Sequence, residues 1–140
     1  MEYITHSEEE TQEVGRQLGQ RLQPNDVIAY FGDLGAGKTA FTKGVAQGLD
    51  IQEYVTSPTF SIVSEYEGRL PLYHFDVYRI QDGDALYDIG YYDYLENGGV
   101  CAIEWSENIE AYLPPRYYRV SIARGTEESD RVITIEKMGE

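Results

Sequence analysis

The sequence has little cysteine, few basic residues and no long apolar run, and each shortage excludes a class of protein. One cysteine among 140 residues excludes an intrachain disulfide and argues against a cysteine-ligated metal cluster. Eleven Lys and Arg residues face 25 Asp and Glu residues, which gives a net charge of −14 and argues against direct binding to a nucleic-acid backbone. No apolar run reaches membrane-spanning length, and no basic N-terminal region precedes an apolar stretch as in a signal peptide. We therefore expect a soluble, cytosolic (cytoplasmic) protein with no membrane contact.

The length and composition indicate one folded domain. A chain of 140 residues suits a single domain, and 41% hydrophobic residues are enough to bury a core. We expect residues 1–140 to form that domain. The excess acidity has two interpretations, which are solubility of the chain and contact with a partner that has a basic face.

One glycine-rich stretch, residues 32–39, has the sequence GDLGAGKT. It matches the phosphate-binding loop pattern G-x-x-x-x-G-K-[ST] at every fixed position. The apolar run at 27–31 predicts a buried strand before it, and the four-residue spacing of Phe41, Val45 and Leu49 predicts a helix after it. An ordinary glycine-rich turn is the alternative, but strand, loop and helix are the context in which phosphate-binding loops occur.

This pattern has a direct chemical rationale. Glycines allow successive backbone N–H groups to turn toward one phosphate, and the helix N-terminus adds partial positive charge. Lys38 can reach the β- and γ-phosphates, and the Thr39 hydroxyl can coordinate Mg²⁺. The residues expected to bind the nucleotide through this loop are Leu34, Gly35, Ala36, Gly37, Lys38 and Thr39.

Two acidic residues could complete the site. Glu104 directly follows the apolar run 100–103, where a second Mg²⁺ anchor or a residue that orients the attacking water belongs. The alternative is an ordinary exposed glutamate at a strand end. His74, Asp76 and Tyr78 would share one face of a strand, and Asp76 could bind a Mg²⁺-coordinated water or act as a base. The alternative for this face is a half-exposed strand with a structural salt bridge.

A third segment, Ser57-Pro58-Thr59, predicts a rigid turn. It follows the loop helix, where the nucleotide-sensing switches of phosphate-loop proteins lie, and Thr59 could approach the γ-phosphate. A tight turn that only precedes a strand fits the spacing equally well.

The remaining sequence predicts an α/β fold. Ser7, followed three residues later by Glu10, fits a capping box that begins the first helix. The mixture of helices and strands predicts a phosphate-loop NTPase-like, three-layer α/β/α sandwich, whose mixed sheet includes antiparallel hairpins. Further strands are expected at 2–5, 60–66, 70–77, 118–122 and 131–135, and short helices at 86–89, 91–96 and 109–113.

Four motifs occur in a fixed order, namely Gly32-Asp33-Leu34-Gly35-Ala36-Gly37-Lys38-Thr39, Ser57-Pro58-Thr59-Phe60, Tyr73-His74-Phe75-Asp76-Val77-Tyr78-Arg79 and Ile103-Glu104-Trp105. Each alone is modestly specific, whereas the four in this order are highly specific. Together they resemble the bacterial TsaE family, the small ATPases of tRNA threonylcarbamoyladenosine biosynthesis. The resemblance runs from the first helix to the final hairpin.

The resemblance implies binding of ATP or ADP with Mg²⁺ and action with two partner proteins, TsaD and TsaB. That complex transfers a threonylcarbamoyl group to the adenosine next to the anticodon of tRNAs that read ANN codons. In this family the ATPase does not perform the transfer; its hydrolysis resets or activates the complex between turnovers. Contact with tRNA would fall to the partners, which agrees with the acidity of this chain.

The resemblance also assigns roles to single residues. Lys38 is implied as phosphate ligand, Thr39 as Mg²⁺ ligand and Glu104 as the second Mg²⁺ anchor, while Asp76 is implied as necessary for hydrolysis. Further implied residues are the switch-like Ser57, Pro58 and Thr59 and the nucleotide contacts Thr11 and Arg131, of which Arg131 aligns near the base.

Three other functions compete with a partner-dependent ATPase. A small-molecule kinase shares the loop and the size, but its usual cluster of lid arginines has no counterpart among the scattered arginines of this sequence. A GTPase switch would need the guanine-reading motif Asn/Thr-Lys-x-Asp, which does not occur. A nucleotide-binding module with negligible turnover of its own is the third. It differs from the partner-dependent ATPase only in whether a partner switches hydrolysis on.

Overall fold

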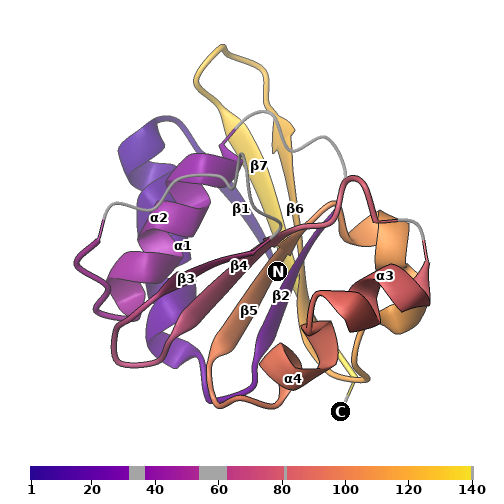
Figure 1. The fold of residues 1–140 in the computed structure, drawn as a ribbon. Helices are drawn as coiled ribbons and strands as arrows, with labels where there is room; N and C mark the ends of the chain where they lie inside the picture. The colour runs from indigo at the N-terminus through magenta and orange to yellow at the C-terminus, as the bar shows by residue number, and fades with distance from the viewer. Residues whose placement is uncertain (32–36, 54–62, 81, 140) are drawn as a thin grey trace.

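A seven-stranded sheet forms the centre of the fold (Figure 1). The computed structural model describes residues 1–31, 37–53, 63–80 and 82–139. The elements within these ranges are β1 (Glu2–Thr5), α1 (Glu8–Arg21), β2 (Val27–Phe31), α2 (Lys38–Gly48), β3 (Val63–Tyr66), β4 (Leu72–Asp76), α3 (Gly83–Asp88), α4 (Tyr91–Leu95), β5 (Val100–Glu104), the 3₁₀ helix η1 (Ser106–Tyr112), β6 (Tyr117–Arg124) and β7 (Arg131–Met138).

The strands follow the order β1-β7-β6-β2-β5-β4-β3. Neighbours from β6 to β4 pair in parallel, whereas β3–β4, β6–β7 and β1–β7 pair antiparallel. The two hairpins predicted from alternation are therefore confirmed, and the edge strand at 2–5 forms as expected. Because β2, β4 and β5 are parallel, their carboxyl ends lie at one edge of the sheet. Most of the predicted phosphate-binding loop, residues 32–36, lies outside the described residues.

The sheet lies between two helical layers, which confirms the predicted three-layer architecture (Figure 1). In β2, Ile28 and Tyr30 pack into one core together with residues of α1 and α2. Val27 packs into the other core, with Leu86 of α3 and Tyr91 of α4. A strand that is apolar on both faces suits this central position, because helices cover both of its sides.

Glycines allow α1 and α2 to pack with their backbones in close approach. A Cβ atom at Gly15 would lie 2.1 Å from the carbonyl oxygen of Phe41, and one at Gly44 would lie 1.9 Å from the carbonyl oxygen of Gln12. Neither position therefore has room for a side chain. This packing holds α2, whose first residue is Lys38, firmly against the sheet and α1.

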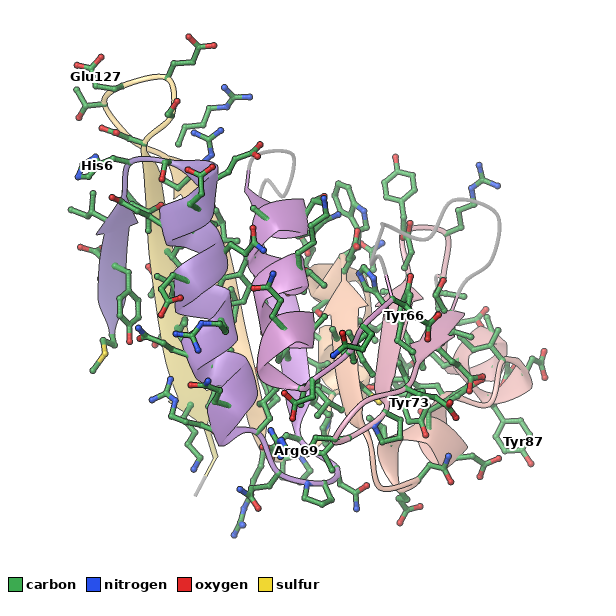
Figure 2. The ribbon with its side chains drawn as sticks, turned by 90° about the vertical axis from the view of Figure 1, so that its left-hand side faces the viewer. His6, Tyr66, Arg69, Tyr73, Tyr87 and Glu127 are labelled. Atoms are coloured by element: carbon green, nitrogen blue, oxygen red, sulfur yellow. The ribbon has the colours of Figure 1, made fainter. Side chains whose placement is uncertain are left out.

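Both ends of α1 are capped. The Ser7 hydroxyl accepts a hydrogen bond from the Glu10 N–H at 3.1 Å, as the capping box predicted, but the Glu10 carboxylate accepts from the N–H of His6, one residue before the cap. At the other end Arg69 donates to the carbonyl oxygens of Gly19 and Leu22, where a cation complements the helix dipole. Figure 2 shows His6 and Arg69 at opposite ends of the molecule.

Two local predictions need correction, and a third lies partly outside the described residues. The strand predicted at 70–77 ends at Asp76, so Tyr78 lies in a turn and does not share a strand face with His74 and Asp76. The helix predicted at 109–113 is the 3₁₀ helix η1, which follows Trp105 in a left-handed conformation at φ 65° and is kinked at Ile109. Of the strand predicted at 60–66, residues 60–62 lie outside the described residues. Within the described ranges, no helix is long and apolar enough to cross a membrane.

Candidate active site

Lys38 and Glu104, both predicted from the sequence as site residues, form an ion pair. Lys38 opens α2 and Glu104 ends β5, so 66 positions of sequence separate them. The Lys38 Nζ donates to Oε1 of Glu104, and the two side chains are 11% and 3% exposed. The alternative of an ordinary exposed glutamate at a strand end is therefore wrong.

His74, from β4, contacts the other oxygen of the same carboxylate. Its Nε2 lies 2.5 Å from Oε2 of Glu104, as an ion-pair contact without the alignment of a directed hydrogen bond. Its second ring nitrogen, Nδ1, is buried and has no hydrogen-bond partner in the part of the chain that the structure describes. Sequence reasoning placed His74 on a face with Asp76 but did not identify this partner.

The surroundings of Glu104 keep its carboxyl group ionised. Burial by itself would raise the pKa of Glu104, but the contacts with His74 and then with Lys38 outweigh burial and lower the pKa below its ordinary value. A buried carboxylate is strongly disfavoured unless it is paired. His74 and Lys38 therefore stabilise the negative charge of Glu104 beside the first turn of α2.

Asp76 lies beside this cluster at the end of the neighbouring strand. In the parallel register of β4 and β5 it pairs directly with Glu104, which places the two backbones about 4.8 Å apart. Asp76 is half-buried, and its Oδ1 accepts a hydrogen bond of 2.9 Å from the N–H of Tyr78. Asp76 and Glu104 therefore lie next to each other at the carboxyl ends of β4 and β5.

Thr11 and Arg131, which the resemblance implied as nucleotide contacts, line one pocket together with Gly37. The pocket has a volume of about 180 Å³ and also presents Glu8 and Glu128. Gly37 begins α2 at φ 85°, and a Cβ there would lie 3.4 Å from Cδ of Arg131. Arg131 donates through Nη1 to the carbonyl oxygens of Glu128 and Asp130, while its Nε is buried without a partner among the described residues.

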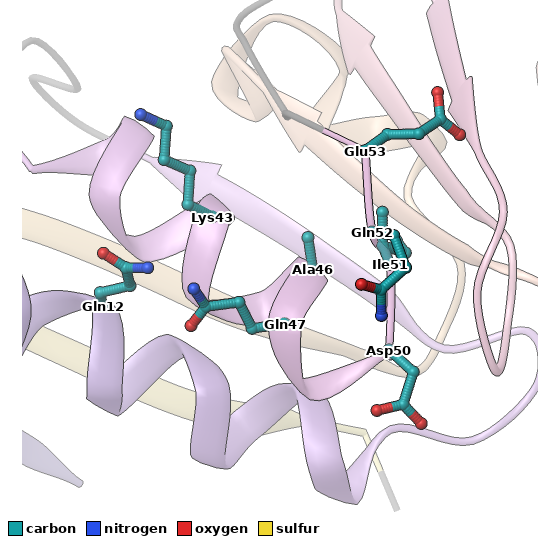
Figure 3. A pocket seen from close by; sticks show the side chains of 8 residues that line it. All are labelled: Gln12, Lys43, Ala46, Gln47, Asp50, Ile51, Gln52 and Glu53. Atoms are coloured by element: carbon teal, nitrogen blue, oxygen red, sulfur yellow. The ribbon is translucent and has the colours of Figure 1, made fainter.

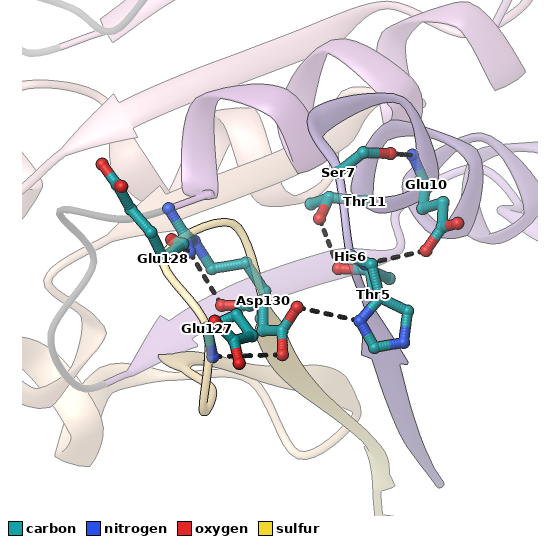
Figure 4. A network of polar contacts seen from close by, with 9 residues as sticks. Thr5, His6, Ser7, Glu10, Thr11, Glu127, Glu128 and Asp130 are labelled. Carbon is teal, nitrogen blue, oxygen red and sulfur yellow. Dashed lines mark hydrogen bonds and ion pairs between the residues drawn. The ribbon is translucent and has the colours of Figure 1, made fainter.

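A polar network that includes Thr11, one of the residues that line this pocket, lies around the start of α1 (Figure 4). The hydroxyl groups of Thr5 and Thr11 lie 2.6 Å apart, and His6 Nδ1 lies 2.8 Å from Oδ1 of Asp130. These contacts connect the start of α1 to the β6–β7 hairpin. Sequence reasoning missed His6, and no local signal could have found it, because its partner lies 124 positions away in the sequence.

An aromatic pair stands directly beside Glu104. Tyr78 and Trp105 pack with ring centroids 4.8 Å apart, and Asn108 donates through Nδ2 to the carbonyl oxygens of Val77 and Tyr78. These contacts connect the turn after Asp76 to the turn after Glu104.

The structure places part of the predicted site. It brings Lys38, Glu104 and Asp76 to one edge of the sheet, with Thr39 exposed next to Lys38, and it joins Thr11 and Arg131 at Gly37. Predicted residues that lie outside the described residues are Leu34, Gly35, Ala36, Ser57, Pro58 and Thr59. A larger pocket of about 570 Å³ lies along α1, α2 and residues 50–53, and no predicted site residue lines it (Figure 3).

Comparison with known proteins identifies the family. The family model of the threonylcarbamoyl adenosine biosynthesis protein TsaE matches residues 5–133. The chain belongs to the TsaE family. This membership confirms the resemblance on which the sequence motifs converged.

Individual TsaE proteins support the same assignment over nearly the whole chain. The tRNA threonylcarbamoyladenosine biosynthesis protein TsaE of Bacillus subtilis (strain 168) is 43% identical over 140 residues, covering 99% of this chain and 87% of that protein. The protein of the same name from Treponema pallidum (strain Nichols) is 41% identical over 135 residues, covering 96% of this chain and 99% of that protein. The crystal structure of Bacillus subtilis YdiB matches with a TM-score of 0.82 at 38% identity, covering 99% of this chain and 86% of that chain.

Proposed function

We propose that the chain is a Mg²⁺-dependent ATPase that converts ATP to ADP and phosphate and acts together with TsaD and TsaB. Its pathway is the threonylcarbamoylation of the adenosine next to the anticodon in tRNAs that read ANN codons. Membership of the TsaE family supports the pathway. The geometry of the site supports the reaction.

The observation that carries the proposal is the meeting of Lys38 with Glu104. A lysine that ends a phosphate-binding loop and an acid at the end of a neighbouring strand are the two charged parts that such a site needs. They lie in contact, although they come from distant parts of the sequence. Asp76, opposite Glu104 in the strand register, supplies a second acid at the same edge.

The residues beside Gly37 fit a nucleotide. Gly37, at the start of α2, has φ 85°, a left-handed conformation that favours glycine, and it lies beside Arg131. The buried Nε of Arg131, which has no partner among the described residues, is a hydrogen-bond donor that a ligand could satisfy. Because Thr11 lines the same pocket as Arg131, we assign the base and ribose to this end of the site.

Each group has a distinct role in the proposed reaction. Lys38 binds phosphate oxygens, and the Thr39 hydroxyl and the Glu104 carboxylate hold Mg²⁺, which requires oxygen ligands and usually retains several waters. When bound, Mg²⁺ neutralises negative charge that develops on the phosphoryl oxygens. Asp76 orients the attacking water or accepts its proton. Phosphate contacts from Leu34, Gly35 and Ala36 and a switch role for Ser57, Pro58 and Thr59 belong to the same proposal.

The decisive experiment is ATP turnover at fixed Mg²⁺, measured for the chain alone and with TsaD and TsaB added. We expect a large increase only in the presence of the partners. Lys38→Ala should reduce turnover at least about a hundredfold, because it removes charge stabilisation of the transition state. Lys137→Ala is the matched control, since Lys137 lies over the Tyr118 ring near the end of β7 and should retain wild-type turnover.

Other outcomes of this experiment redirect the proposal in defined ways. Equal turnover with and without partners would contradict the partner-dependent mechanism while leaving the nucleotide site intact. Transfer of phosphate to a metabolite in a phosphoacceptor screen would replace the ATPase by a small-molecule kinase. Unchanged turnover in Lys38→Ala would contradict the site itself.

A further inference from the structure

The carboxylate of Glu104 has two partners, Lys38 and His74. In the proposed function only Lys38 also binds the nucleotide. Oε1 faces Lys38 and Oε2 faces His74. If Lys38 binds phosphate oxygens, as proposed above, its contact with Oε1 competes with the nucleotide. The contact between His74 and Oε2 has no such competitor, because His74 is 1% exposed and belongs to β4, which is paired on both sides, with β5 and β3.

We infer that His74 is a positioning residue that holds the Glu104 carboxylate in place for Mg²⁺. In this arrangement His74 would hold the carboxylate through Oε2 while Oε1, which Lys38 contacts here, would be available to the metal. The inference rests on the proposed function, because it requires Glu104 to be a metal ligand. It adds a residue to which neither the family resemblance nor the sequence pattern assigned a role.

The chemistry of the contact supports this assignment. An ionised carboxylate only accepts hydrogen bonds, so the Nε2 atom of His74 must present the hydrogen. Side chains that orient a metal-binding carboxylate from behind typically change metal affinity by 10–100-fold when they are replaced. The short distance from Nε2 to Oε2, 2.5 Å, and the burial of both groups give this contact little freedom to rearrange.

The strand register explains why this position in the chain can perform the role. His74 and Asp76 are two residues apart in β4, and Glu104 pairs with Asp76 in β5. A side chain two residues before Asp76 on the same face therefore lies diagonal to Glu104. The residues next to His74 and Glu104 on this face, Leu72 and Ala102, are buried, so the contact between His74 and Glu104 is shielded from solvent.

The test compares two amide substitutions at position 74. In His74→Gln the terminal amide reaches about as far as Nε2 and can still donate to Oε2, whereas in His74→Asn it stops near the position of Nδ1. Both variants bury one neutral amide, so the comparison isolates the donor at the far position. Thr42→Val is the control for loss of a buried hydrogen bond, because Thr42 contacts the Tyr30 hydroxyl at 2.7 Å and not Glu104.

The primary readout is nucleotide binding and not turnover. Trp105 is the one tryptophan in the sequence and directly follows Glu104, so its fluorescence can report ATP binding during titrations with Mg²⁺ and in EDTA. We expect His74→Asn to raise the Mg²⁺ concentration at half-effect by about tenfold or more. ATP affinity in EDTA should stay within about twofold of wild type, because Lys38 is unaltered. His74→Gln should recover most of the Mg²⁺ response.

Three results would overturn the inference. An unchanged Mg²⁺ response in His74→Asn would contradict it while leaving the proposed ATPase intact. An equal loss of the Mg²⁺ response in His74→Gln, His74→Asn and Thr42→Val would show that position 74 acts only through the stability of the fold. Thermal unfolding of each variant measures that stability. A wild-type chain whose ATP binding ignores Mg²⁺ would contradict both the metal assignment in the proposed function and this inference.

Discussion

Glu104 combines a negative charge with almost complete burial, and its stability contribution should depend on pH. Contacts with His74 and Lys38 lower its pKa in spite of burial. A carboxyl group whose pKa is lower in the folded chain than in the unfolded chain stabilises the fold above the unfolded value, and this stabilisation is lost as the pH falls through the folded value.

The corresponding prediction compares wild type with Glu104→Gln in urea unfolding from pH 3 to pH 7. The difference in free energy of unfolding should be constant above pH 4.5, the ordinary pKa of a glutamate carboxyl group, and should shrink as the pH falls below it. One pKa unit corresponds to about 1.4 kcal/mol, so the loss measures how far the pKa is lowered. A difference that is independent of pH throughout this range would contradict the ionised, paired state of Glu104.

At the same scale, sequence reasoning identified some site residues and missed others. Lys38 and Glu104 were predictable because each stands at a fixed place relative to a motif or an apolar run. His74 was visible only as a polar residue in an apolar strand, since its partner is set by pairing between β4 and β5. His6 carried no signal at all.

The packing of α1 against α2 depends on four glycines, Gly15, Gly19, Gly44 and Gly48, at which the two backbones approach closely. In an isolated helix, alanine is more favourable than glycine by about 1 kcal/mol. In Gly44→Ala, however, the new methyl group would meet the Gln12 carbonyl oxygen at 1.9 Å, and overpacking of this kind typically destabilises by about 1–3 kcal/mol.

We therefore expect Gly44→Ala to lower the free energy of unfolding by about 1–2 kcal/mol in spite of its higher helix propensity. Urea denaturation monitored by circular dichroism measures the change. Gln20→Ala, on the exposed side of α1, should stay within about 0.5 kcal/mol of wild type. A neutral or stabilising Gly44→Ala would mean that the two helices can move apart freely.

The β6–β7 hairpin is a second element with a testable attachment, the contact of Asp130 with His6. The hydrogen bond and charge of Asp130 raise the pKa of His6, and His6 in turn lowers the pKa of Asp130. The contribution of His6 is complete below its ordinary value of 6.5 and is lost as the pH rises through its raised value. The stabilising contribution of Asp130 is present above pH 3.8, its ordinary pKa, and is lost as the pH falls through its lowered pKa.

The attachment should thus be strongest between about pH 4 and pH 6.5. We expect hydrogen-exchange protection of the hairpin loop at residues 126–129 to fall about two- to fivefold between pH 6 and pH 8.5, after correction for intrinsic rates, a modest effect because the pair is exposed. Asp130→Asn should remove most of this pH dependence. Equal protection at both pH values in wild type would exclude the ion pair as the attachment.

For the whole molecule, the net charge of −14 decides which partners the chain can meet directly. Binding to nucleic-acid phosphates depends on lysine and arginine and weakens with salt. We expect the chain alone to bind no tRNA detectably in filter-binding assays at low salt, and to be retained with tRNA only when TsaD and TsaB are present. Salt-dependent tRNA binding by the chain alone would contradict an indirect role.

The sequence by itself determined the family, the phosphate-binding motif, the α/β architecture and both hairpins. These features depend on local patterns: the spacing of apolar residues, the capping box at Ser7 and the fixed positions of the glycine loop. Such patterns are legible along the chain because helices and strands repeat over a few residues. The same locality explains the errors, since neither the end of β4 nor the 3₁₀ form of η1 follows from periodicity alone.

Only the tertiary structure decided which side chains meet. It placed Glu104 in a buried contact with both Lys38 and His74, and it joined Thr11 and Arg131 at Gly37. These encounters depend on strand order and register, which pair β4 with β5 and bring the β6–β7 hairpin beside α1. Strand order and register depend on how the whole sheet buries its two faces, and so on residues that are distant in sequence. A short stretch of sequence therefore cannot predict them.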